Sequence, residues 1–227
     1  MARNRDPFTQ ALSSLRDRIQ SGVLPGGTPV IVQDEARRLN LSTTPIREAL
    51  ARLSGEGLVE RAASGGYVTQ RLDAAAARER YAMRGEYIRI AFDLNRSALG
   101  FVRPPAPPFD PATPGMSTSR LFASIVRSAG NQVLWTAFDQ VVGQLEFLGR
   151  LEPCLFDDFE PEARALHAAY TMDAAPGFAE AADAFHRRRI SASAALAALA
   201  YRKHDGEAFA PCAAGIPSPA RLTDGLP

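Results

Sequence analysis

The most constraining feature of this chain is the stretch of residues 32–69, where two short helical patterns are followed by two strand patterns. The first helical pattern places Ala36 and Leu39 on one face. The second has an apolar stripe at helical spacing, formed by Ile46, Ala49, Leu50 and Leu53. The two patterns are separated only by Asn40 and Leu41, so a tight turn must join the helices.

Local signals mark the ends of these elements. Residues 42–44, Ser-Thr-Thr, are N-cap types, and Pro45 is tolerated because it falls in the first helical turn. Residues 58–61 and 67–69 read as strands around a turn in which Gly65 and Gly66 permit positive φ angles. Helix, turn, helix and wing is a geometry that places the second helix in the DNA major groove. The stretch therefore predicts a DNA-binding module.

The same residues carry a family resemblance. Residues 41–50 read LSTTPIREAL, followed by Leu53 and by EGLV at residues 56–59. This run resembles the signature of GntR-family transcriptional regulators, and the resemblance covers roughly residues 8–70. It implies a winged helix-turn-helix, which we assign to residues 1–72, and a C-terminal domain that binds an effector. We therefore expect a sequence-specific transcriptional regulator, acting as a repressor, and not an enzyme.

Small hydroxyl donors and one cation lie at the exposed start of the second helix. Arg47 can contact a phosphate or a guanine edge, and hydroxyls with the unpaired N–H groups of a helix start can bind phosphate. The resemblance assigns DNA contacts to matching positions, and many relatives have arginine at two of them, Gln33 and Thr43. The predicted DNA-binding residues are Gln33, Ser42, Thr43, Thr44, Arg47 and Gly66.

The remaining composition is that of an ordinary globular protein. No apolar run reaches the ~20 residues that a membrane span needs, and the N-terminus lacks the apolar core of a secretion signal. Two cysteines, Cys154 and Cys212, are too few for a disulfide scaffold or a zinc finger. We expect a cytoplasmic protein without a membrane partner.

Outside residues 32–69 the patterns are mainly helical. A first helix is expected from Pro7 to about Ser21, capped by Asp6. After residue 70 no strand pattern appears, so residues 73–204 are predicted to be an all-helical domain with a proline-rich loop at residues 103–115. Its expected helices cover residues 73–99, 121–128, 133–150, 160–172, 176–186 and 187–202. Residues 205–227 are predicted to be a poorly ordered tail. The expected fold is mainly α: three helices with a β-hairpin wing, then an all-α bundle.

An all-helical domain after this winged helix resembles the FadR branch of the family, whose effector domain is of the FCD type. The resemblance rests on Tyr81 and Arg84, on residues 128–131 (SAGN) and on His167 and Phe185-His186. It implies a metabolite, an organic acid, bound inside the bundle and modulating operator affinity. The residues predicted to bind it are Arg84, Asn131, His167 and His186.

Many members of that branch hold the effector through a divalent metal bound by one aspartate and three histidines. Here Thr118 and Phe122 stand at the aspartate and first histidine positions, so only His167 and His186 remain as metal ligands. Two histidines make a weak site, although Asp183, three residues before His186, could rebuild one. We therefore expect no required cofactor and keep a metal as an alternative.

The resemblance also implies partners. We expect a homodimer that binds a pseudo-palindromic double-stranded operator. One alternative is a DNA-binding architectural dimer that needs no effector, its helical domain serving only to dimerise. A metal-dependent enzyme in the helical domain is a remoter alternative, because no hydrolase elbow, phosphate loop or zinc-protease motif occurs.

Overall fold

A computed structural model describes residues 6–63, 65–97, 104–172 and 175–202 of the chain. It divides into two compact units, one centred on residues up to Leu72 and the other on residues from Asp73 to Ala198, which we describe separately. The predicted tail at residues 205–227 and the predicted loop residue 103 lie outside the described residues. No helix in the described part of the chain is long and apolar enough to cross a membrane.

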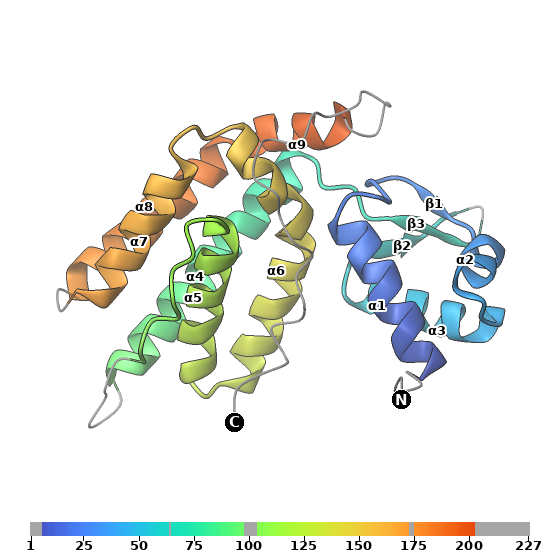
Figure 1. Cartoon of the computed structure of the whole chain (residues 1–227), viewed down its shortest axis with the longest axis horizontal. Helices are drawn as coiled ribbons and strands as arrows, with labels where there is room; N and C mark the ends of the chain where they lie inside the picture. The colour runs from blue at the N-terminus through green and yellow to red at the C-terminus, as the bar shows by residue number, and fades with distance from the viewer. Residues whose placement is uncertain (1–5, 64, 98–103, 173–174, 203–227) are drawn as a thin grey trace. The chain divides into compact units, whose positions relative to one another are not determined.

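The first unit has three helices and a small sheet, coloured blue to teal in Figure 1. Its elements are α1 (Pro7–Gln20), β1 (Pro29–Val30), α2 (Val32–Leu39), α3 (Thr43–Gly55), β2 (Val59–Arg61) and β3 (Tyr67–Thr69). The sheet is antiparallel in the order β1-β3-β2, with Val59 opposite Thr69 and Arg61 opposite Tyr67. The predicted winged helix-turn-helix is confirmed, but the wing has a third strand, since Pro29 pairs with Val68.

The local signals of this unit act as the sequence indicated. The Asp6 carboxylate caps α1 by accepting a hydrogen bond from Thr9 N at 3.2 Å. Asn40 ends α2 in the left-handed conformation (φ 54°), which allows Leu41 N to donate to Ala36 O at 2.9 Å and turns the chain into α3. The fully buried core residues of the helices are Ala11, Leu15, Ile46, Ala49, Leu50 and Leu53.

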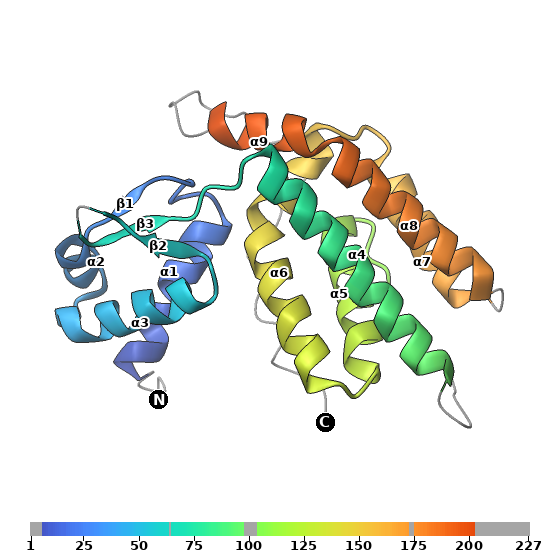
Figure 2. The ribbon, with the colours of Figure 1, turned by 180° about the vertical axis from the view of Figure 1, so that it is seen from behind.

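The second unit is a bundle of six helices in the described residues, and this prediction is also confirmed. They are α4 (Ala74–Ser97), α5 (Pro114–Ser128), α6 (Gln132–Leu151), α7 (Phe159–Thr171), α8 (Ala175–Ser191) and α9 (Ser193–Arg202), with a 3-10 turn at Glu152–Cys154. Helix α4 packs against α5, α6 and α8, and α7 packs against both α5 and α8. Helices α4, α5, α7 and α8 thus form a closed ring, which Figures 1 and 2 show from opposite sides.

Two boundaries of the bundle differ from the prediction. The proline-rich segment was expected to extend to residue 115, but α5 begins at Pro114, because a proline in the first turn of a helix loses no helical hydrogen bond. The break between the last two helices falls at residue 192, not after His186. A continuous α8 is required to place His186 and Arg189 on the same buried face.

Candidate functional sites

The start of α3 presents unused hydrogen-bonding groups to solvent. Residues 42–44 are exposed, and the side chain of Ser42 forms no capping hydrogen bond with the helix. The first N–H groups of any helix lack helical partners, and they carry a partial positive charge from the helix dipole. Because Ser42 does not cover them, hydroxyls and N–H groups are available together at this helix start. Such a surface binds phosphate oxygens.

Arg47 lies one turn further along α3, and it is exposed. Within the described residues it forms no ion pair, whereas most of the other arginines described in this unit pair with a carboxylate. Arg16 pairs with Glu56 at the end of α3, and Arg18 pairs with Glu35 on α2. The other paired arginines of the unit are Arg37, Arg38 and Arg52. Arg47 therefore offers its charge to an external anion.

Gln33 and Gly66 complete the predicted DNA-binding set, and both are exposed. Gln33 lies in the first turn of α2. Gly66 has φ +84°, beside Gly65 at φ +89°, and its carbonyl accepts a 3.3 Å hydrogen bond from Ala62 N. The tip of the wing depends on these two glycines because a side chain strains a left-handed backbone.

Sequence reasoning did not single out Arg61, which ends β2 at the base of the wing. Its side chain is exposed, and its guanidinium carbon lies 5.8 Å from the centre of the Tyr67 ring on the paired strand. A cation held against an aromatic face keeps a defined direction. The available signal in the sequence was an arginine at the end of one wing strand and a tyrosine at the start of the next.

The second unit holds a polar cluster inside its helical ring. Four polar side chains, one from each helix of the ring, have buried atoms: Arg84 on α4, Thr118 on α5, His167 on α7 and His186 on α8. Arg84 Nε donates a 3.2 Å hydrogen bond to His186 Nε2. Three atoms of the cluster are buried without a hydrogen-bond partner: Arg84 Nη2, Thr118 Oγ1 and His167 Nε2.

The protonation state of His186 follows from its two partners. Its Nδ1 lies 2.7 Å from Ala182 O, and since a carbonyl can only accept, Nδ1 carries the hydrogen. Nε2 is therefore the acceptor for Arg84. Burial lowers the pKa of His186 to about 3, and the Arg84 charge adds to this effect. Burial also lowers the pKa of Arg84.

Gly85 makes this arrangement possible. A Cβ atom at residue 85 would lie 3.1 Å from Cγ of the His186 ring, closer than side chains normally pack. A glycine inside a helix is otherwise unfavourable, by about 0.5–1 kcal/mol relative to alanine. The structure gives a reason for it: the helix must leave room for the imidazole beside Arg84.

The cluster does not fit the metal that the family resemblance implies. Phe122 supplies an aromatic face, its ring centre 5.4 Å from that of His186, where a ligand was expected. The lone pair of His186 Nε2 is already used by the Arg84 guanidinium. Among the described residues, no group of three or more His, Cys, Asp or Glu side chains could hold a metal.

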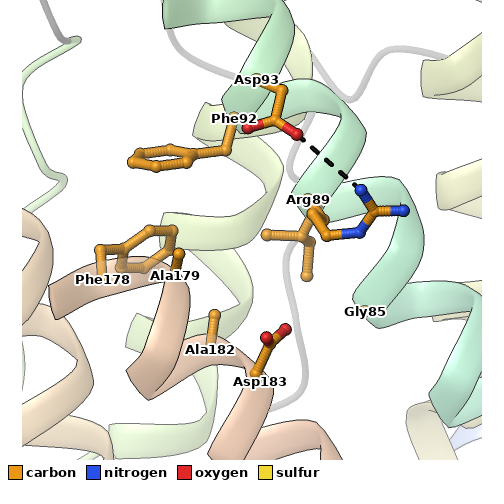
Figure 3. A pocket seen from close by; sticks show the side chains of 9 residues that line it. Gly85, Arg89, Phe92, Asp93, Phe178, Ala179, Ala182 and Asp183 are labelled. Atoms are coloured by element: carbon orange, nitrogen blue, oxygen red, sulfur yellow. Dashed lines mark ion pairs between the residues drawn. The ribbon is translucent and has the colours of Figure 1, made fainter. Parts of the chain in front are cut away.

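Asp183, the residue that could have rebuilt the metal site, lies elsewhere on α8. It is exposed and lines a shallow groove between α4 and α8 (Figure 3), together with Arg89 and Phe92. The cavity volume of this groove is about 40 Å³, which is close to that of one or two water molecules. In the groove Arg89 is paired with Asp93 and also with Glu86.

Asn131 does not share the buried setting of the other three predicted effector residues. It is exposed, and its Oδ1 accepts a 3.0 Å hydrogen bond from Leu134 N as the N-cap of α6. The Ser-Ala-Gly-Asn run thus has a structural task, namely to end α5 and begin α6.

A second buried network, which the sequence did not indicate, adjoins Arg84. Arg189 is fully buried; its Nε donates to Glu152 Oε2 at 3.1 Å, and its Nη1 lies 2.7 Å from Glu162 Oε2. Tyr81 donates its hydroxyl to Glu152 Oε1 at 3.0 Å, and burial raises the Tyr81 pKa well above its usual value. Glu162 links α7 to α8 through Arg188 and Arg189.

Comparison with known proteins agrees with the geometry of the first unit. Residues 8–68 match the model of the family described as bacterial regulatory proteins, gntR family. This match covers the three helices and nearly all of the wing. No curated protein matches the chain.

Solved structures share the fold over most of the chain. Escherichia coli McbR/YncC is similar with a TM-score of 0.58 at 16% identity, over 88% of this chain and 99% of that one. A structure from Rhodococcus sp. RHA1, described as a transcriptional regulator GntR, gives a TM-score of 0.63 at 17% identity, over 86% and 99% of the two chains. At these identities the likeness concerns the fold, including the all-helical second unit. The family match itself is confined to residues 8–68, so it is the first unit that matches the gntR family of bacterial regulatory proteins.

Proposed function

We propose that the protein is a cytoplasmic repressor that binds a specific operator through α3 and the wing. The observation that carries this proposal is Arg47, which is exposed and has no ion pair in the described part of the chain, beside the start of α3, where Ser42 forms no side-chain cap. Arg47 reads a base edge in the major groove, while the hydroxyls of residues 42–44 and the first N–H groups of α3 hold phosphates. Gln33 and the backbone of Gly66 add contacts from α2 and from the wing tip.

Two copies of the chain bind one operator. A single winged helix reads one half-site, so a two-fold dimer reads a pseudo-palindrome whose spacing reflects the dimer axis. Support comes from α4, where three large apolar side chains are at least 40% exposed at helical spacing: Met83, Ile90 and Leu94. Sedimentation equilibrium of the wild type against Ile90→Glu tests the dimer, which this substitution should weaken.

A small metabolite, an organic acid, bound in the second unit changes the operator affinity. The buried Arg84, with a donor that has no partner among the described residues, supports an anionic ligand. The coupling between effector and operator is reciprocal: a metabolite that releases DNA is itself bound less tightly by the DNA complex.

The test is in vitro selection of random duplex DNA by the full-length protein, with and without pooled organic acids. Arg47→Ala is compared with Arg52→Ala, an exposed arginine on the same helix that is paired with Glu56. We expect a two-fold-symmetric site that is lost in Arg47→Ala and kept in Arg52→Ala. A site that both variants select equally would contradict the assigned contacts. Operator affinity unchanged by every acid would favour the effector-independent dimer.

A further inference from the structure

The wing of the first unit carries one cation, and it lies just before the tip. Residues 53–70 contain a single basic side chain, Arg61, and residues 62–66 read AASGG, without charge. Arg61 is exposed, and it forms no ion pair in the part of the chain that the structure describes. Solvent pays little to keep such a charge unpaired, so the guanidinium is free to meet an external anion.

The register of the sheet sets the direction in which Arg61 projects. Val59 pairs with Thr69, and Arg61 pairs with Tyr67. Side chains alternate along a strand, so both pairs project from one face of the sheet and Glu60 projects from the other. Val59 and Thr69 are buried, and Tyr67 packs against the hydrophobic core that also contains the α3 stripe. Arg61 therefore leaves the wing on the side where the helices lie.

The Tyr67 ring restricts the guanidinium before any ligand binds. The guanidinium carbon of Arg61 lies 5.8 Å from the centre of that ring. A cation that already rests against an aromatic face loses less freedom when it binds an anion. Figures 1 and 2 show the wing extending toward the end of the first unit where α2 and the start of α3 lie. The wing cation and the exposed start of α3 thus serve the same end of this unit.

We propose that Arg61 binds a backbone phosphate of DNA, in the strand that runs between the groove occupied by α3 and the wing. This inference rests on the proposed function and adds a contact that neither the start of α3 nor the wing tip provides. The guanidinium donates to the phosphate oxygens, and Tyr67 is a positioning residue that does not touch DNA. A phosphate carries no base identity, so the contact fixes the register of the wing on the duplex.

Fluorescence anisotropy of the full-length protein with operator and scrambled duplexes, at several salt concentrations, tests this contact. Arg61→Ala should weaken binding of both duplexes equally, by severalfold, and lower the slope of log affinity against log salt by about 0.9, the value for one phosphate. The matched control is Arg52→Ala, an exposed arginine paired with Glu56, which should keep the slope. An unchanged slope in Arg61→Ala would overturn the proposal. A loss confined to duplexes with A·T-rich flanks would also overturn it, because that pattern indicates readout of groove shape.

Two further variants test the positioning role of Tyr67. Tyr67→Phe keeps the ring and removes only the hydroxyl, so it should bind both duplexes like the wild type. Tyr67→Leu keeps an apolar side chain on the core but removes the ring face, so it should weaken binding by less than Arg61→Ala does. It should add no further loss in the Arg61→Ala background, because the two residues act as one unit. A loss in Tyr67→Phe, or additive losses, would contradict the positioning role, with thermal melting confirming that each variant folds.

Methylphosphonate substitution, which removes the charge of one phosphate at a time, locates the contact on a duplex that the protein binds. We expect one backbone position at which this substitution weakens binding of the wild type but not of Arg61→Ala. Equal effects on the two proteins at every position would contradict a phosphate contact by Arg61.

The outcomes separate this contact from the proposed function. If Arg61→Ala lowers the salt slope on both duplexes while the wild type shows no preference for any operator, the contact stands and specific reading fails. If the wild type selects an operator that Arg47→Ala loses and Arg61→Ala binds with an unchanged slope, the function stands and this contact is wrong. If no duplex is bound at low salt, both are wrong.

Discussion

The start of α3 and the interior of the helical ring each hold an arginine without a carboxylate partner in the described residues. Water surrounds Arg47, so its charge costs little and remains available to a phosphate. Burial removes that solvation from Arg84, and the fold compensates in part with the His186 acceptor and with aromatic rings, while Nη2 has no partner among the described residues. The same type of side chain is thus solvated in one unit and packed in the interior of the other. Substituting the exposed arginine of the first unit should change DNA affinity. Substitutions in the interior of the second unit should change the free energy of unfolding.

The largest effect is expected from Arg189→Met in the buried network. This substitution leaves the Glu152 carboxylate, which is 3% exposed, with Tyr81 as its remaining side-chain partner. Breaking a buried pair from one side costs about 3–5 kcal/mol of unfolding free energy. Urea unfolding followed by the fluorescence of Trp135, the single tryptophan of the chain, reports the helical unit alone.

Arg37→Met is the contrasting surface substitution. Arg37 pairs with Asp34, but its side chain is 80% exposed, so the loss should be under about 1 kcal/mol. The unfolding of this variant is followed by circular dichroism of the full chain, because the first unit has no tryptophan. If the two substitutions cost the same, the distinction between surface and interior charges would be wrong.

The next largest effect is a pH dependence of the unfolding free energy, and it is confined to the helical unit. The pKa of His186 is about 3 when folded and near 6.5 when unfolded, so the unfolded chain binds more protons between these values. The contribution of His186 to the free energy of unfolding is fully present well above pH 6.5. It falls as pH is lowered toward 3, by about 1.4 kcal/mol per pH unit. Urea unfolding between pH 6.5 and 5 should therefore show a loss of about 2 kcal/mol from this residue.

His186→Gln isolates that contribution. Burial raises the pKa of Glu146, which makes its own contribution fall as pH rises, so only the difference between wild type and variant reports His186. The first 72 residues contain no histidine, so the unfolding free energy of the first unit should lack this dependence on pH. An identical pH profile for wild type and His186→Gln would mean that His186 is solvated, contrary to its burial.

Arg47→Ala should lower operator affinity without lowering stability. The expected loss is about 1–3 kcal/mol if Arg47 reads a base, with relaxed specificity at that base pair. If it contacts only a phosphate, the loss is smaller, equal for all sequences, and accompanied by a salt slope reduced by about one. Fluorescence anisotropy of operator and scrambled duplexes at several salt concentrations distinguishes these results. Loss of thermal stability in Arg47→Ala would contradict the solvated setting of its charge.

The first unit could be predicted almost completely because its signals are local. The capping Asp6, the residues around Pro45 and the two wing glycines each determine the backbone within a few residues. Only the pairing of β1 with the wing was missed, because a two-residue strand has no periodicity. Asn40 also fits this rule, as asparagine tolerates the left-handed conformation that the turn requires.

The interior of the second unit could be predicted only in part because its partners are distant in sequence. Resemblance indicated Arg84 and His186, but a hydrogen bond across 102 residues is not a local pattern. The buried pairing of Arg189 with Glu152 contradicts the usual rule that such residues are exposed, so nothing in the sequence marked it. Asn131 is the contrasting case, since the predicted pocket residue has a local contact, the N-cap of α6.

The smallest predicted effect compares two helical glycines with opposite expected signs. Alanine in a helix interior is favoured over glycine by about 0.5–1 kcal/mol when space is available. A Cβ added at Gly149 in α6 would have nothing within 4 Å, so Gly149→Ala should stabilise the helical unit by that amount. At Gly85 the Cβ would meet the His186 ring at 3.1 Å, and that ring cannot retreat because both nitrogens are hydrogen-bonded.

Gly85→Ala should therefore destabilise the unit by about 1 kcal/mol after the helix-propensity gain is offset by overpacking. Trp135 fluorescence in urea measures both variants. Stabilisation by Gly85→Ala equal to that by Gly149→Ala would show that His186 yields freely. The imidazole would then not be the fixed support that positions Arg84, and the interior arginine would resemble the surface one in its freedom to move.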